Sequence, residues 1–147
     1  GCLSDYRSRD VLDSHILAHR MSEPLVRVSR RRLPRSLATC LPRQIKLVRI
    51  SPLVSQKLNR MYRGKRRPAN VLSFRYDGSY GEILICPSVI RREARQRGVF
   101  YRDQMTWMVV HGMLHLAGAH HEKSRQMARR VRRLEAVILK KIFDSES

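Results

Sequence analysis

The chain has 147 residues, of which 42% are hydrophobic, and its 31 Lys and Arg residues against 12 Asp and Glu give a formal net charge of +19. This length suits one domain with its own core, and no apolar run approaches the roughly 20 residues that cross a bilayer, so a membrane-spanning protein is excluded. The charge excess indicates a polyanionic partner, with nucleic acid as the leading candidate and an anionic lipid surface as the alternative.

Positive charge is concentrated in one stretch of the chain. No acidic residue occurs between Glu23 and Asp77, whereas Arg and Lys recur throughout. This distribution favours binding to the phosphate backbone of RNA or DNA over a merely soluble basic surface.

The cysteines are odd in number and lack a metal-type spacing, which predicts a reducing compartment and no disulfide framework. The first residues lack the apolar core of a secretory signal, so we expect a cytoplasmic protein. A mitochondrial or plastid matrix is the alternative, because the stretch after Met21 is rich in Arg, Ser and Leu. The cysteines are Cys2, Cys40 and Cys86, and the last is expected to be buried.

The first part of the chain mixes charges and carries weak structural signals. Residues 1–20 are interpreted as an N-terminal extension with a short amphipathic helix, and residues 21–147 as a single domain. Leu25–Ser29, with the sequence LVRVS, alternates and predicts a first strand. A basic segment with a short helix after Pro34 follows, and Gln44–Ile50 alternates as a half-buried strand.

The middle of the chain predicts a helix and then a hairpin. Ser51 followed by Pro52 is a helix start signal, and the helix should run to about Tyr62 and stop at Gly64. Asn70–Tyr76 and Glu82–Cys86 are expected strands, joined by the turn DGSYG as an antiparallel hairpin. The expected apolar face of the helix comprises Leu53, Val54, Leu58 and Met61.

Three further helices are expected after the hairpin. Pro87 opens one that runs through Arg97 and ends at Gly98, Gln104–Ala117 forms a buried one, and Lys123–Phe143 closes the chain. This order predicts an α+β fold, with a small mixed four-stranded sheet surrounded by helices and a central metal-binding helix packed on the sheet. The core stripe of the closing helix is expected to comprise Met127, Val131, Leu134 and Ile138.

The sequence VHGMLHLAGAHHE, residues 110–122, holds four of the six histidines. His111 and His115 are four residues apart, so on a helix their imidazoles lie one turn from each other and can reach one ion. Gly118 suits a left-handed helix end, and the turn would bring His121 back as a third ligand. Three imidazoles that leave a fourth position for water are the pattern of a catalytic zinc site, although other transition ions also suit them.

The chain contains two other histidine arrangements. His15 and His19 have the same spacing, but they lack the glycine turn and a third histidine, so we expect no metal there. His120 is adjacent to His121 and is a candidate for orienting a ligand, for proton transfer, for competition as a ligand, or for simple solvation.

The chemistry of such a site is hydrolytic, because a metal lowers the pKa of its water to about 7 and polarises a carbonyl or phosphoryl oxygen. Zinc proteases of the His-Glu-x2-His type need a glutamate directly after the first histidine, and this chain has Gly112 there. Glu122 lies nearby, but nothing in the spacing places it over the water. The basic charge favours a phosphodiester substrate, for which cations are needed near the scissile phosphate. The candidates for RNA binding are Arg60, Arg63, Lys65, Arg66 and Arg67.

The chain resembles the YbeY endoribonuclease family from about Gln44 to the end of the closing helix. The resemblance is carried by three motifs that occur in this order: LNRMYRGKRRPANVLSF, GEILIC and HGMLHLAGAHH. The resemblance implies a metal-dependent, single-strand-specific endoribonuclease that matures the 3′ end of small-subunit ribosomal RNA and acts in ribosome assembly. It implies contacts with the small subunit and with assembly factors such as a GTPase. It matches His111, His115 and His121 to the metal ligands, with zinc as the expected ion, and Arg63 to an essential arginine, so Arg63 and His111 are the catalytic candidates.

The chain departs from the family pattern at three places. Ala69 and Asn70 precede Val71 where the pattern usually reads Thr-Asp, Glu82 stands in place of Asp, and His120 stands where Asp commonly precedes the third histidine. A carboxylate beside a ligand imidazole typically contributes about 10- to 100-fold in metal affinity. The alternative hypothesis is therefore a weakly active or inactive RNA-binding assembly factor of the same fold.

Overall fold

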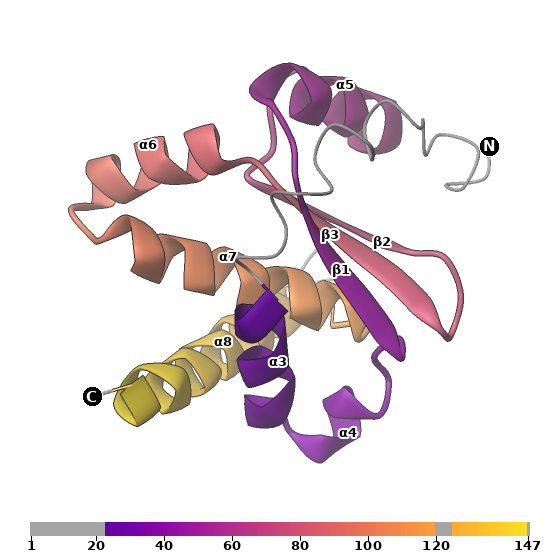
Figure 1. The fold of residues 1–147 in the computed structure, drawn as a ribbon, viewed down its shortest axis with the longest axis vertical. Coiled ribbons are helices and arrows are strands. Elements are labelled where there is room, and N and C mark those ends of the chain that lie inside the picture. The colour runs from indigo at the N-terminus through magenta and orange to yellow at the C-terminus, as the bar shows by residue number, and fades with distance from the viewer. Residues whose placement is uncertain (1–22, 120–124, 147) are drawn as a thin grey trace.

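The structure, a computed structural model, describes residues 23–119 and 125–146. Figure 1 shows the elements around a small sheet. Among the described residues, no helix combines the length and the apolar character needed to cross a bilayer. In chain order the elements are α3 (Glu23–Arg32), α4 (Arg35–Ala38), β1 (Gln44–Arg49), α5 (Pro52–Arg63), β2 (Val71–Arg75), β3 (Tyr80–Ile85), α6 (Pro87–Arg97), α7 (Tyr101–Leu116) and α8 (Arg125–Glu146).

The three strands form one mixed sheet in the order β1-β3-β2. β1 runs parallel to β3, with Leu47 opposite Ile83, and β2 pairs antiparallel to β3, with Ser73 opposite the same residue. The predicted hairpin and the α+β class are confirmed. Apolar residues cover both faces of the central strand, because Ile83 and Ile85 are 0% exposed on one face and Leu84 is 4% exposed on the other.

The expected strand Leu25–Ser29 is wrong, because these residues lie within helix α3. Val26, Ser29 and Leu33 are buried, and their spacing of three and four residues is helical. A five-residue alternation is too short to distinguish the two periods when the flanking residues continue the helical one. The described part of the chain consequently contains three strands instead of the expected four. Residues 1–20, the expected extension, lie outside the described residues.

Helix α5 begins and ends as predicted. The Ser51 hydroxyl accepts a hydrogen bond from the Val54 amide at 3.2 Å, and Gly64 ends the helix in the left-handed conformation with φ 66°. The expected apolar face is partly wrong, because Leu53 is 75% exposed and Met61 is 52% exposed. Leu58 and Val54 of the expected face do pack inward, in the apolar cluster against the sheet. Ser55 and Asn59, also buried, bind the loop before β2.

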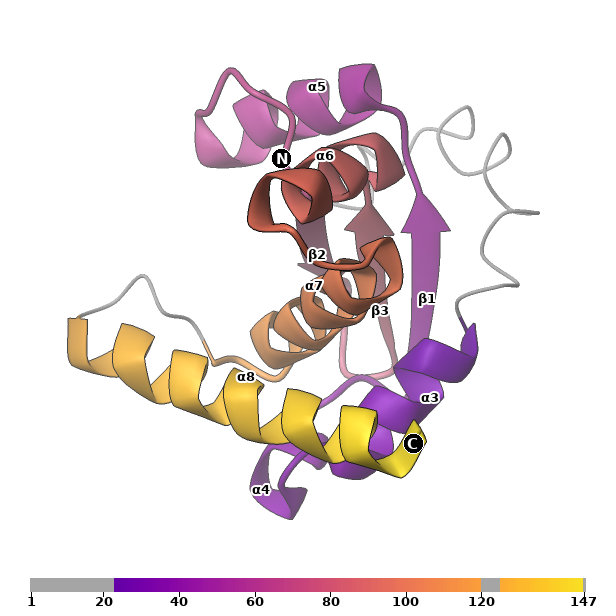
Figure 2. The same ribbon diagram turned by 90° about the vertical axis from the view of Figure 1, so that its left-hand side faces the viewer.

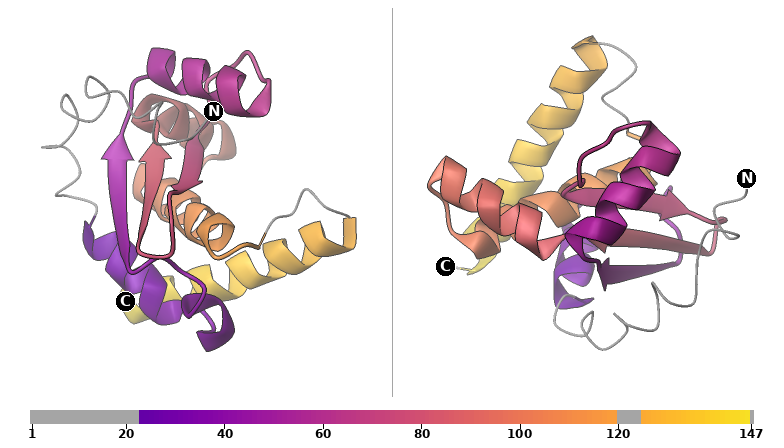
Figure 3. Two further views of the ribbon diagram at one scale, coloured as in Figure 1. Left: turned by 90° about the vertical axis from the view of Figure 1, so that its right-hand side faces the viewer. Right: turned by 90° about the horizontal axis from the view of Figure 1, so that it is seen from above.

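Helix α7 lies between the sheet and α8 (Figure 2). It begins three residues earlier than predicted and is buried at most positions from Gln104 to Leu116. Helix α3 packs beside it, and both views in Figure 3 show α8 on the side of α7 away from the strands. The predicted stripe of α8 is confirmed at Val131 and Ile138, which are 2% and 1% exposed. Helix α6 ends at Gly98, as expected.

Candidate metal centre and basic pockets

His111 and His115 lie side by side on α7, with ring centroids 4.4 Å apart and the rings tilted by 43°. Both imidazoles are half-buried, so they remain within reach of solvent. The predicted pairing of these two side chains is confirmed. His120 and His121 lie outside the described residues, and within residues 23–119 and 125–146 no group of three or more His, Cys, Asp or Glu residues could hold a metal. The third ligand stays a prediction.

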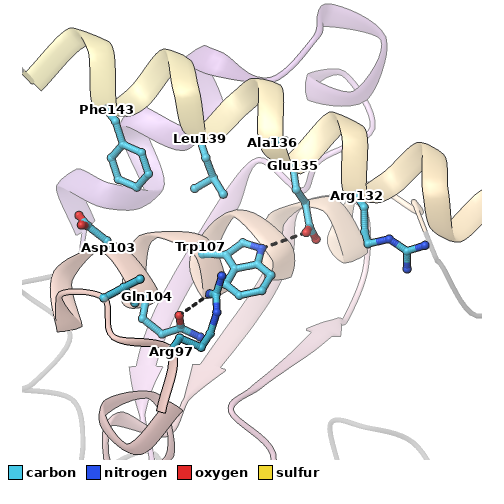
Figure 4. Close-up of a pocket in the computed structure, with 10 residues that line it drawn as sticks. Arg97, Asp103, Gln104, Trp107, Arg132, Glu135, Ala136, Leu139 and Phe143 are labelled. Carbon is cyan, nitrogen blue, oxygen red and sulfur yellow. Dashed lines mark hydrogen bonds between the residues drawn. The ribbon is translucent and has the colours of Figure 1, made fainter. Parts of the chain in front are cut away.

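A buried carboxylate from α8 supports the first histidine. One oxygen of Glu135 is in hydrogen-bond contact with Nδ1 of His111, and the other accepts a hydrogen bond from the Trp107 indole at 3.0 Å (Figure 4). A carboxylate bonded to one ring nitrogen fixes the tautomer, so that the other nitrogen serves as the ligand atom; this is the usual surrounding of a metal-binding histidine. The donor set and its support therefore fit a transition-metal ion.

Sequence reasoning missed Glu135. A signal for it exists, since Val131, Glu135 and Ile138 recur at helical spacing on the buried face of α8. Glu135 is 4% exposed, and a carboxylate is almost never fully buried without a partner. An acidic residue within an apolar stripe thus indicates a buried polar partner, although the stripe does not identify it.

The end of α7 forms the turn that Gly118 predicts. This glycine has φ 91°, its amide donates to the carbonyl of His115 at 3.0 Å, and the Ala119 amide donates to that of Leu114 at 2.9 Å. These two bonds define a Schellman motif. Arg75 of β2 adds a third contact, because its Nη1 donates to the carbonyls of Leu116 at 2.8 Å and of Cys40 at 2.6 Å. The turn that leads toward His121 is therefore anchored to the sheet.

Gly112, between the two histidines, faces the sheet. A Cβ at this position would lie 2.9 Å from Ile83 Cγ2 and 3.1 Å from Ser73 Oγ, and the Ser73 hydroxyl donates to the Gly112 carbonyl at 3.0 Å. A glutamate here would enter the sheet and not the space beside the histidines. Packing therefore supports the argument from the sequence against a zinc protease.

A basic pocket of about 600 Å³ lies between the end of α5, the following loop and α6. Three of the five predicted RNA-binding cations line it, namely Arg63, Lys65 and Arg67. Arg60 and Arg66 are exposed but do not line this pocket. Arg92 of α6 joins them and was missed, because an arginine on the exposed side of a helix gives no sequence signal of its own.

Polar side chains of α5 hold the loop that carries these cations. The Ser55 hydroxyl bonds to both the amide and the carbonyl of Ala69, at 2.8 Å and 2.7 Å. The Asn59 amide donates to the Arg67 carbonyl at 2.7 Å, and that of Gln56 to the Arg66 carbonyl at 2.6 Å. The bonds of Ser55 and Asn59 explain why these two buried positions of α5 are polar.

A second pocket, of about 440 Å³, lies beside His115 and is lined by Ser73, Arg75 and Gly118 among others. In this pocket Arg75 of β2 and His115 of α7 line the same space. No sequence pattern indicated this role of Arg75. The residue ends a strand, and only the fold shows which helix lies beside that strand.

Two of the three departures from the family pattern have structural partners. Asn70 donates to Glu93 at 3.2 Å and accepts from the Val71 amide at 2.7 Å, so it ties the start of β2 to α6. Glu82 is 1% exposed and accepts from the Tyr80 hydroxyl at 2.9 Å. Strand alternation places Glu82 on the face with Leu84, away from α7. Neither residue therefore faces the histidine pair.

Comparison with known proteins gives consistent matches. Residues 19–143 match the family model described as "Endoribonuclease YbeY". A protein of that name from Bordetella petrii is 37% identical over 108 residues, which cover 70% of this chain and 69% of the relative. One from Bdellovibrio bacteriovorus is 39% identical over 84 residues, or 56% of each chain, so the match spans little more than half of that relative.

A solution structure of a Thermotoga maritima protein has the same fold, with a TM-score of 0.53 and 22% identity, and the match covers 83% of this chain and 86% of that one. The family model spans most of the chain and includes the histidine helix, the hairpin and the basic loop. The chain therefore belongs to the YbeY endoribonuclease family.

Proposed function

We propose that this protein is a metal-dependent endoribonuclease that cleaves single-stranded RNA, and that it acts in maturation of the 3′ end of small-subunit ribosomal RNA and in ribosome assembly. The observation that carries the proposal is the pair His111 and His115, supported by the buried carboxylate of Glu135. The relatives' name supports the reaction class, and the net charge of +19 supports the polyanionic substrate. We place its partners on the small ribosomal subunit, including assembly factors such as a GTPase, in the cytoplasm or an organelle matrix.

His111, His115 and His121 would together hold one zinc ion. Bound there, zinc would provide a water with a pKa near 7 and would polarise a phosphoryl oxygen. Glu135 keeps the His111 ring oriented through Nδ1, and Gly112 holds α7 against the sheet at the level of the two rings. Arg63, Lys65, Arg67 and Arg92 bind the RNA phosphates through charge-assisted hydrogen bonds, which position the strand and neutralise developing charge.

A second candidate is an RNA-binding assembly factor that kept the fold with weak or no activity. His120 favours it, since a neutral or cationic imidazole there replaces a carboxylate of the usual pattern. Its RNA affinity would fall with rising salt in the same way as that of the enzyme, so binding alone does not separate the two.

The decisive experiment combines elemental analysis with cleavage of small-subunit ribosomal RNA by the wild type, His111→Ala and Arg63→Glu. The expected result is about one zinc per chain in the wild type, loss of metal in His111→Ala, and loss of cleavage in both variants and in wild type treated with chelator. The matched control is His19→Ala. His15 and His19 have the same four-residue spacing as His111 and His115, so this variant should leave the metal content and the cleavage rate unchanged. Wild type that is loaded with metal yet inert would favour the assembly factor.

A further inference from the structure

A separate pocket of about 430 Å³ lies between the α6–α7 turn, the first half of α7 and α8. In Figure 4, Phe143, Leu139 and Ala136 of α8 lie along one side and Trp107 of α7 along the other. Its volume falls within the range of about 300–1,000 Å³ that is usual for small-ligand sites. The walls are mainly apolar, so they suit a flat, uncharged body.

One buried polar group in this pocket lacks a partner. Gln104 is 1% exposed, and its Oε1 accepts a hydrogen bond from Arg97 Nη1 at 2.8 Å. Its Nε2 has no hydrogen-bond partner within the described part of the chain. A buried donor of this kind is normally satisfied. The Nε2 atom is covered in this structure, so the side chain must rotate toward the pocket before an acceptor there can satisfy it. Because Oε1 is already bonded to Arg97, Gln104 can offer a ligand only the N–H donor of Nε2. This donor favours a ligand with an acceptor oxygen, such as a carbonyl oxygen.

The charges around the pocket favour a ligand that carries a negative group at its edge. The guanidinium of Arg97 lies 4.2 Å from the centre of the Trp107 ring, and Arg132 is exposed at the other end of the lining. The two carboxylates of the lining are Asp103, which is half-buried, and Glu135, which is engaged with Trp107 and His111. A flat body with a carbonyl oxygen and an attached phosphate matches this arrangement, and a nucleotide has all three features.

The pocket also borders the candidate metal centre. Trp107 and His111 are four residues apart on α7, about 6 Å along the helix axis, and the Glu135 carboxylate contacts both side chains. A strand whose phosphate lies at the histidines therefore has a neighbouring nucleotide within reach of the pocket.

We propose that this pocket binds one unstacked base of single-stranded RNA, with Gln104 Nε2 donating to a carbonyl oxygen of the base and with Arg97 and Arg132 next to the flanking phosphates. The proposal rests on the proposed function for its substrate. Uracil, cytosine and guanine carry carbonyl oxygens that project from the ring, whereas adenine presents only ring nitrogens as acceptors. The pocket therefore prefers uridine, cytidine and guanosine to adenosine.

The fluorescence of Trp107 tests occupancy directly, because the chain contains one tryptophan. The protein is titrated, with chelator present to prevent cleavage, with short single-stranded oligouridylate and oligoadenylate and with uridine 5′-monophosphate. We expect saturable quenching by oligouridylate at lower concentration than by the other two. In Ala136→Phe, which fills the pocket from an exposed position of α8, the midpoint should rise at least tenfold. The matched control Val137→Phe, at a position 51% exposed and outside the lining, should match the wild type.

The variant Gln104→Met tests the proposed hydrogen bond. It removes the unpartnered Nε2 and also the Oε1 that accepts from Arg97, and methionine has a similar size. Arg97 is exposed and can bond to water instead, so the fold should be preserved at a cost of about 1 kcal/mol. One neutral hydrogen bond corresponds to about a three- to tenfold preference. We expect this preference for oligouridylate over oligoadenylate to disappear in Gln104→Met while oligoadenylate binding is retained.

Failure of this inference is distinguishable from failure of the proposed function. Wild type that cuts RNA but shows no quenching, or equal midpoints for Ala136→Phe and Val137→Phe, would overturn the base pocket and leave the nuclease standing. Quenching that Ala136→Phe abolishes in a protein without cleavage would support the pocket and overturn the nuclease. Tighter binding of uridine 5′-monophosphate than of oligouridylate would assign the pocket to a free nucleotide and overturn its role toward RNA.

Discussion

His111 and Glu135 are 24 residues apart in the chain and lie on different helices, yet the imidazole Nδ1 and the carboxylate are in direct hydrogen-bond contact. The side chain of Glu135 is 5% exposed and that of His111 is 22% exposed, so the contact is shielded from water while the ring remains within reach of it. Helix α8 is therefore a part of the candidate metal centre, although it supplies no metal ligand among the described residues.

Replacing Glu135 should weaken metal binding. In Glu135→Ala the His111 ring loses the group that fixes its tautomer, and we expect zinc affinity to fall by about 10- to 100-fold. In Glu135→Gln the side chain keeps one acceptor oxygen, which His111 and Trp107 cannot both use. We therefore expect a zinc affinity between those of the wild type and Glu135→Ala. Competition with a zinc-binding dye measures the affinity. Equal affinities for the wild type and Glu135→Ala would show that the contact does not support the metal ligand.

Gly112→Ala should destabilise the protein despite the better helix propensity of alanine. The added Cβ would meet Ile83 Cγ2 at 2.9 Å in a part of the core where Ile83 is 0% exposed. Overpacking of this kind costs about 1–3 kcal/mol. Urea unfolding of the metal-free protein measures the change. Gly78→Ala is the control, because nothing lies within 4 Å of the added Cβ, and it should change stability by less than about 0.5 kcal/mol.

Arg92→Ala should weaken RNA binding through loss of one phosphate contact. Each such contact contributes about 0.7 to the slope of the logarithm of the binding constant against the logarithm of the salt concentration for single strands. Titration of a labelled single-stranded RNA at several salt concentrations measures this slope. Lys57→Ala is the control, since this exposed cation of α5 does not line the basic pocket. Identical slopes for Arg92→Ala and the wild type would remove Arg92 from the interface.

Arg75→Met should loosen the turn after α7. The variant loses the bonds to the carbonyls of Leu116 and Cys40, and we expect a stability loss of about 1 kcal/mol together with weaker zinc binding. Arg75→Lys retains a donor and should recover part of both losses. Zinc competition and urea unfolding report the two effects separately. Unchanged zinc affinity in Arg75→Met would confine the role of Arg75 to stability.

The two cysteines in the described part of the chain should differ in reactivity. Burial raises the pKa of the Cys86 thiol, whose residue is 0% exposed, whereas Cys40 is exposed. A raised pKa keeps the thiol protonated over more of the pH range, and the thiolate is the reactive form. At pH 8 we expect iodoacetamide to modify Cys40 in the folded protein and Cys86 only after denaturation, as mapped by mass spectrometry. Equal rates in the folded protein would contradict the packing of β3.

Local signals accounted for most of the helices and for the hairpin. The cap at Ser51 and the turns at Gly64, Gly98 and Gly118 were predicted from a few neighbouring residues, and the structure confirms each one. The strand predicted at residues 25–29 was wrong. A short pattern reflects only the local preference of the chain, and the prediction holds only where tertiary packing favours the same element. At residues 25–29, packing of Val26 and Leu33 into the core favours the helix.

The sequence by itself determined that His111 and His115 share a helix face, because residues four apart on a helix are neighbours wherever that helix lies. It also determined the cationic character of the loop that follows α5. Only the tertiary structure decided that Glu135 supports His111, that Arg92 joins Arg63 in one pocket, and that Leu139 of α8 lines a pocket together with Trp107. These contacts join elements that are distant in the chain, and the packing of whole helices against each other and the sheet sets their distances.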